Sequence, residues 1–189
     1  MINNLVNLVQ QLSGKAIINN PEIPNEQNNT VIQSATEGIF KGLQNQAMSG
    51  GLGQILNMFN SSGNNSISDT LSRNVQSAVV SSLMEKSGIK SGIAKGIASQ
   101  LVPLVLSALS KHATDPKNSN FNISDILSSL TGGQTKGMDI GSLLDKFAGN
   151  GDGKLDLNDV TSFFSKKSSG GKSNEGGIMG ALGSLLGGK

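Results

Sequence analysis

The segment from Ser91 to His112 constrains the fold most, because it is apolar on almost every side of the helix that it predicts. One set of residues forms a stripe at helical spacing, and a second set fills the remaining faces. The stripe comprises Ile93, Ile97, Leu101, Leu104, Val105 and Ala108, and the second set comprises Val102, Leu106 and Leu109. A helix that is apolar all round is stable in water only when other elements surround it. We therefore expect a buried central helix over about 91–112, kinked at Pro103 because proline removes a backbone donor.

The rest of the chain up to about residue 131 also shows helical spacing, and no run alternates long enough to predict a strand. The expected helices are a first one that stops at Gly14, one over about 31–47, a short one over about 52–59, one or two within 66–87 that end at Gly88, and one over 123–130 capped by Asn122 or Ser124. Pro21 and Pro24 lie in a polar connection between the first two helices. The predicted fold class is all-α, a multihelical bundle.

Two short motifs within this bundle carry a resemblance to a known family. They are Ser49-Gly50-Gly51-Leu52-Gly53-Gln54-Ile55-Leu56, and Gln100-Leu101-Val102-Pro103 on the helix that follows Ile89. The chain resembles the YidB-like family of bacterial proteins over roughly residues 1–130. The resemblance implies an all-helical bundle with one central helix wrapped by others, and it implies no enzyme activity. An Asn-rich insertion at 19–29 and an extension beyond about residue 131 depart from the family pattern.

The composition excludes several classes of protein. The 15 basic and 13 acidic side chains leave a net charge of +2, which excludes a nucleic-acid binder that works by bulk charge. The absence of cysteine and the presence of one histidine exclude thiol catalysis, disulfides and most zinc sites. The start of the chain lacks a basic region and is interrupted by asparagines, so it predicts no secretory signal. The uncharged, strongly apolar stretch between Lys95 and Lys111 is shorter than the ~20 residues of a membrane-spanning helix. We expect a cytoplasmic protein.

The chain divides into three predicted parts: the bundle at 1–131, a helix-loop-helix unit at 132–168, and a Gly-rich spacer with a short apolar tail at 169–189. Glycine-rich segments at 131–137 and 168–177 separate them.

The helix-loop-helix unit carries the one constellation of residues with metal chemistry. Four of the eight aspartates fall between residues 145 and 159, and the segment 148–159 aligns with the calcium loop of an EF-hand. Gly153 falls at the sharp turn of that loop. The candidate ligands are Asn150, Asp152, Lys154 through its carbonyl, Asp156 and Asp159. The flanking apolar residues, Leu144, Phe147, Val160, Phe163 and Phe164, fit two short helices around the loop, so this unit resembles the EF-hand family.

Two departures weaken the predicted calcium site. Ala148 replaces the aspartate expected at the first loop position, and Asp159 replaces the longer glutamate at the last. The loss of one carboxylate and the shorter reach of another predict a weak affinity for Ca²⁺, about 10⁻⁴ M or poorer. The alternative is a metal-free helix-turn-helix kept for its glycine turn and for the contact of Leu155.

The apolar tail predicts an interaction with another surface, and the charged residues outside the loop indicate no catalytic site. Ile178, Met179, Leu182, Leu185 and Leu186 would share one face of a helix. That face could dock on a second copy or on another protein, or contact a membrane surface; alternatively, the tail packs on its own domain or remains disordered. The nearly uncharged polar side argues against anionic lipid. Glu37 and Lys41 form an expected surface pair on one helix. The leading hypothesis is a non-enzymatic structural or interaction protein that self-associates through helical surfaces and the tail. The alternative is a weak calcium-binding module.

Overall fold

The computed structural model describes residues 2–60, 67–114 and 122–133, and these ranges contain helices and turns without a strand. The helices are α1 (Ile2–Leu12), α2 (Asn28–Gln46), α3 (Leu52–Asn60), α4 (Asp69–Ser87), α5 (Ser91–Thr114) and α6 (Ile123–Leu130). Short helical segments of other pitch lie between them: η1 (Gly14–Ile18), η2 (Asn25–Gln27) and η3 (Ala47–Gly51). Every helix packs against another, which confirms the prediction of an all-α bundle. The predicted helix-loop-helix unit and the apolar tail lie outside the described residues.

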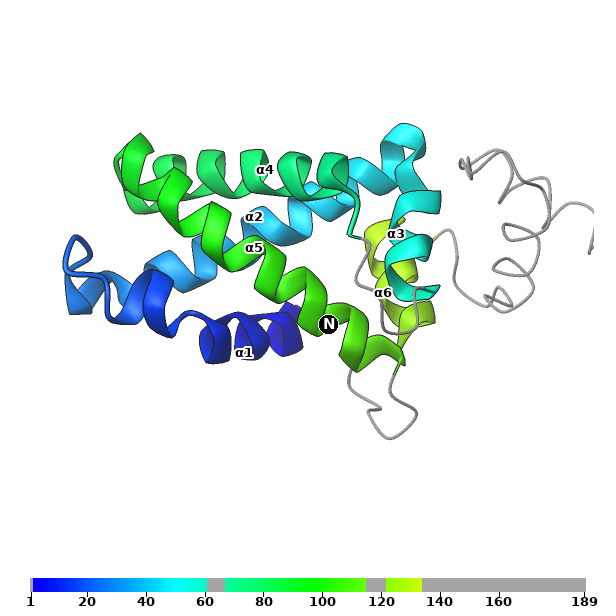
Figure 1. The fold of residues 1–189 in the computed structure, drawn as a ribbon, viewed down its shortest axis with the longest axis horizontal. Coiled ribbons are helices and arrows are strands. Elements are labelled where there is room, and N and C mark those ends of the chain that lie inside the picture. The colour runs from blue at the N-terminus through cyan, green and yellow to red at the C-terminus, as the bar shows by residue number, and fades with distance from the viewer. Residues whose placement is uncertain (1, 61–66, 115–121, 134–189) are drawn as a thin grey trace, which may run out of the picture.

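Helix α5 provides much of the buried core and contacts α4, α1, α3 and η1 (Figure 1). Leu101, Val102, Val105, Leu106 and Leu109 are completely buried along it. The helix continues through Pro103 without interruption.

One side of α5 nevertheless faces solvent, which the sequence did not indicate. Leu104, assigned to the buried stripe, is 52% exposed, and Pro103 beside it is also exposed. The neighbouring helices cover α5 on several sides but leave this strip open to solvent. The core therefore uses only part of the apolar residues that the sequence places around this helix.

Helices α2 and α4 run antiparallel and approach each other more closely than ordinary side chains allow. A Cβ atom added to Gly38 would lie 2.6 Å from Val79 Cα, and one added to Gly42 would lie 2.8 Å from Val75 Cα. Hydroxyl groups join the same two helices: Ser82 Oγ donates to the Ser34 carbonyl at 2.8 Å. The two glycines, one helical turn apart, therefore bring the two backbones together.

The turn from α2 into α3 is held by side-chain amides. Gly50 within η3 has a φ of 82°, a conformation that favours glycine. Gln46 at the end of α2 accepts from Asn74 Nδ2 of α4 at 2.8 Å and donates from Nε2 to Gln54 Oε1 of α3 at 3.3 Å. Ser68, the N-cap of α4, donates to the same Gln54 oxygen at 3.3 Å. These bonds connect α2, α3 and α4 at one corner of the bundle.

The connection between α1 and α2 contributes to the core, whereas the sequence predicted a polar connection. Pro21 and Pro24 lie in it as expected, but Ile17 and Ile23 are buried and belong to the core. The chain after Gly14 forms the π-helical turn η1. This segment is therefore part of the bundle and not only a polar linker.

The α4–α5 connection offers a test of local backbone conformation. Gly88 ends α4 in the left-handed region, with a φ of 64°, and a Cβ there would meet no atom within 4 Å. We expect Gly88→Ala to lower the free energy of unfolding by about 1 kcal/mol, because only the backbone conformation is unfavourable. Gly88→Asn should lose less, since asparagine tolerates this conformation. Urea denaturation followed by circular dichroism measures both variants; equal losses for alanine and asparagine would contradict the backbone explanation.

Candidate interaction surfaces

The predicted calcium ligands Asn150, Asp152, Lys154, Asp156 and Asp159 all lie outside the described residues, so the structure leaves this prediction open. Within ranges 2–60, 67–114 and 122–133, no three histidine, cysteine, aspartate or glutamate side chains lie together in a metal-binding group. The described part of the molecule instead presents two surfaces, a polar groove and an apolar face with basic residues.

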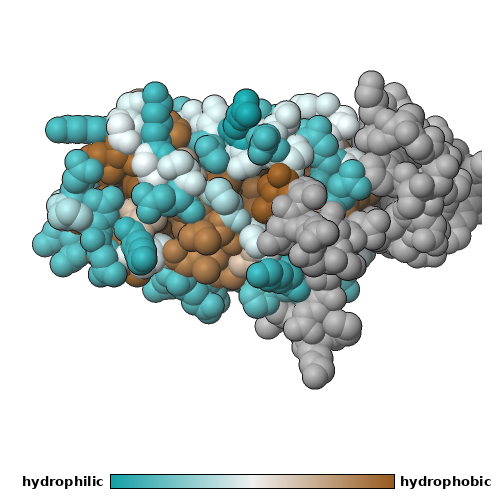
Figure 2. Space-filling view, viewed as in Figure 1, coloured by the Kyte–Doolittle hydropathy of each residue, from teal (hydrophilic) through white to brown (hydrophobic). Residues whose placement is uncertain are grey.

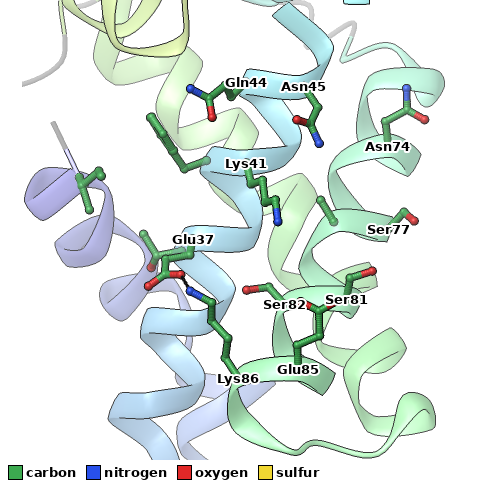
Figure 3. Close-up of a pocket in the computed structure, with 14 residues that line it drawn as sticks. Glu37, Lys41, Gln44, Asn45, Asn74, Ser77, Ser81, Ser82, Glu85 and Lys86 are labelled. Carbon is green, nitrogen blue, oxygen red and sulfur yellow. Dashed lines mark hydrogen bonds and ion pairs between the residues drawn. The ribbon is translucent and has the colours of Figure 1, made fainter. Parts of the chain in front are cut away.

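The polar groove, of about 640 Å³, lies along the outer side of the α2–α4 pair (Figure 3). The close approach at Gly38 and Gly42 leaves the flanking side chains of the two helices to form its walls. Its lining is mostly hydroxyl, amide and charged groups, with few apolar side chains. These residues are Ile2, Thr36, Glu37, Phe40, Lys41, Gln44, Asn45, Asn74, Ser77, Ala78, Ser81, Ser82, Glu85 and Lys86.

An ion pair crosses one part of this groove. Lys86 of α4 pairs with Glu37 of α2, and both side chains are about half exposed. Glu37 thus pairs across the helix interface with Lys86 and not with Lys41, the partner that the sequence predicted. The separation of 49 residues between the partners explains why spacing along one helix could not reveal the pair. Exposed pairs of this kind contribute little to stability, about 0–1 kcal/mol.

The groove balances its charges and has few apolar side chains. The lining contains two acidic residues, Glu37 and Glu85, and two basic residues, Lys41 and Lys86, so it has no net charge. Ile2 and Phe40 give it one apolar corner, and the same two residues continue into a smaller hollow with Asn3 and Ser129. The groove therefore has no charge bias toward an anionic or a cationic ligand.

The second surface is formed by α1, η1 and α5, which contact one another. We call it the basic face. Its charged residues are Lys15, Lys95 and Lys111, all exposed, and none of the three elements contains an aspartate or glutamate. His112 lies in the last turn of α5. The nearest acids after η1 in the chain are Glu22 and Glu26, in the connection to α2.

The basic face also carries most of the exposed apolar bulk of the described residues. Of the five large hydrophobic side chains that are exposed among the described residues, three belong to α1, η1 and α5: Leu104 at 52%, Ile18 at 39%, and Ile2 at 50%, which also lines the polar groove. Figure 2 shows apolar surface gathered over α1 and the middle of α5, bordered by polar residues. Such a patch with a polar rim is typical of interaction surfaces.

The sequence shows which charged residues the basic face contains. It does not show that α1, η1 and α5 lie next to one another. Residues 2–18 and 91–114 lack acids, and this is visible in the printed chain. Only the packing of α1 and η1 on α5 brings the two stretches together.

One described helix, over Ser91–Ala113, is long and apolar enough by length and composition to cross a membrane. The core helix of a soluble protein meets the same criterion, and α5 provides much of the buried core here.

Comparison with protein-family models, with curated proteins and with solved structures finds no match for this chain. The resemblance to the YidB-like family therefore stays a prediction from the two short motifs.

Proposed function

We propose that this chain is a non-enzymatic structural or interaction protein that self-associates through helical surfaces and its apolar tail. The observation that supports this most is Leu104, a large apolar side chain that is 52% exposed at the middle of α5, a long and largely apolar helix. A large apolar side chain left in water at the centre of such a helix gains free energy when a partner covers it. The tail at 178–186 supplies a second apolar surface in the sequence. A cytoplasmic location agrees with this proposal.

Self-association predicts a molar mass above that of one chain. We expect multi-angle light scattering to give a multiple of 19.5 kDa for the full chain, and a lower degree of association for a truncation at Gly171, which removes the tail. Equal monomeric masses for the two proteins would contradict the proposal.

A point substitution tests the helical surface separately from the tail. Leu104→Gln should weaken the association, because it replaces exposed apolar area with an amide. Met48→Gln is the matched control, since Met48 is also 52% exposed but lies in η3, away from the basic face. Equal association of both variants and the unmodified chain would remove Leu104 from the interface.

The second candidate function is weak calcium binding by the loop at 148–159. Its support is the clustering of four aspartates between residues 145 and 159, a costly arrangement of like charges unless a cation relieves it. We expect calorimetric titration with calcium to show binding near millimolar concentration. Asp152→Ala and Asp156→Ala should abolish the heat, whereas Asp69→Ala, in the first turn of α4, should leave it unchanged. No heat from the unmodified chain at millimolar calcium would reject this function.

A further inference from the structure

The polar groove between α2 and α4 contains one cation and one anion that have no ionic partner. Glu37 and Lys86 satisfy each other, but no ion pair joins Lys41 or Glu85 to another residue within the described ranges. Figure 3 shows Lys41 extending from α2 into the space between the two helices, while Glu85 lies on the α4 wall. Opposite charges therefore stand unpaired on the two walls of one groove.

An unpaired cation and an unpaired anion on the same face make that face complementary to itself. When two copies of a chain meet through a two-fold axis, every contact occurs twice. Lys41 of each copy can then meet Glu85 of the other. Because the groove has no net charge, the two faces approach each other without overall repulsion.

The side chains of the two walls also differ in length. The α2 wall carries the long side chains of Glu37, Lys41 and Gln44. The middle of the α4 wall carries only small side chains, those of Ser77, Ala78, Ser81 and Ser82. Long side chains of one copy can enter the space above the small side chains of the other, as helix ridges pack into helix grooves.

One end of the groove adds apolar surface to this face. Ile2 is 50% exposed, Phe40 is partly buried, and both line the groove. A second copy that covers them removes apolar area from water, which favours association. The charged side chains then determine how the two copies are oriented.

We propose that the face of the α2–α4 pair that holds the polar groove is the contact surface for a second copy of this chain, with Lys41 of each copy paired to Glu85 of the other. This inference rests on the proposed self-association and names a surface that carries it. The same face serves in both copies, so the contact closes as a dimer.

Two opposite charge reversals, each made in the full chain, test this pairing. Lys41→Glu places a carboxylate opposite Glu85 at both contacts of the dimer, and Glu85→Lys places an ammonium group opposite Lys41 at both. We expect each variant alone to associate at least about tenfold more weakly by light scattering, because like charges meet twice.

An equimolar mixture of the two variants should associate as tightly as the unmodified chain, since opposite charges then meet at both contacts. With one variant labelled with ¹⁵N, native mass spectrometry distinguishes the mixed dimer from the two uniform dimers. We expect the mixed dimer to predominate.

Lys90→Glu and Glu22→Lys are the matched controls. Both residues are exposed, and neither lines the groove. These variants change the net charge of the chain in the same way as the two test variants, but each should associate as the unmodified chain does. Circular dichroism confirms that all four variants remain folded.

The outcomes separate this inference from the proposed function. A monomeric unmodified chain contradicts both. Association that neither reversal in the groove weakens overturns this contact surface and leaves self-association in place. Association that each reversal weakens and that the mixture does not restore overturns the pairing of Lys41 with Glu85 between copies.

Discussion

Gly38→Ala should lower the free energy of unfolding by about 2 kcal/mol, even though alanine is the better helix former. The added methyl would lie 2.6 Å from Val79 Cα and 3.1 Å from the Ala78 carbonyl oxygen. Both are backbone atoms of α4, so no side-chain rotation relieves the contact and the two helices must move apart. Overpacking of this kind costs about 1–3 kcal/mol. The displacement would also strain the bond from Ser82 Oγ to the Ser34 carbonyl on the same interface.

Gly96→Ala is the matched control for this prediction. Gly96 lies within α5, and a Cβ there meets no atom within 4 Å. The same substitution should therefore stabilise the protein by up to about 1 kcal/mol through helix propensity alone. Thermal and urea denaturation followed by circular dichroism measures both variants, since the chain has no tryptophan or tyrosine. An unchanged or raised midpoint for Gly38→Ala would show that α2 and α4 are not in close contact.

Leu101→Ala should cost about 2–5 kcal/mol of unfolding free energy. Leu101 is completely buried at the centre of α5. Its truncation removes apolar contacts and leaves a cavity, because the surrounding helices can relax only in part. The loss is a large fraction of the 5–15 kcal/mol that is typical of a domain.

Leu104→Ala provides the comparison on the same helix, three positions later. Leu104 is 52% exposed, so the same substitution should change the unfolding free energy by only about 0.5 kcal/mol. The measurement is made at low protein concentration, where association does not contribute to stability. Similar losses for the two variants would place Leu104 in the core, as the sequence pattern indicated.

Local features of the fold were predictable because local chemistry sets them. Asn122 caps α6 by accepting from the Ser124 backbone N–H at 2.8 Å, as its position before an apolar run indicated. Gly88 ends α4 in the left-handed conformation that a glycine at a helix end favours. Leu71, Val75, Val79 and Leu83 repeat every four residues, and all four are buried.

Long-range features were not predictable in the same way. The partner of Glu37 is Lys86 on another helix, and the closeness of Gly38 to Val79 depends on how α2 and α4 cross. The buried Ile17 and Ile23 lie in a stretch whose prolines and asparagines indicated a polar connection. In each case, the outcome depends on how parts of the chain that are far apart in the sequence pack together.

The candidate surfaces also divide into those that the sequence predicts and those that depend on tertiary packing. The acidic loop and the apolar tail are continuous in the chain and were identified from it. The basic face required α1 and η1 to pack on α5, and its exposed Leu104 contradicted the apolar pattern of that helix.

For the described residues, the sequence by itself determined that the chain is helical, roughly where its main helices begin and end, and which residues of each helix share a side. Hydrogen bonding within a helix and the 3.6-residue repeat make these properties local. The tertiary structure alone decided which apolar side chains are covered and which stay open to a partner. Burial depends on the neighbours that a side receives, and the finite number of helices around α5 leaves Pro103 and Leu104 in solvent.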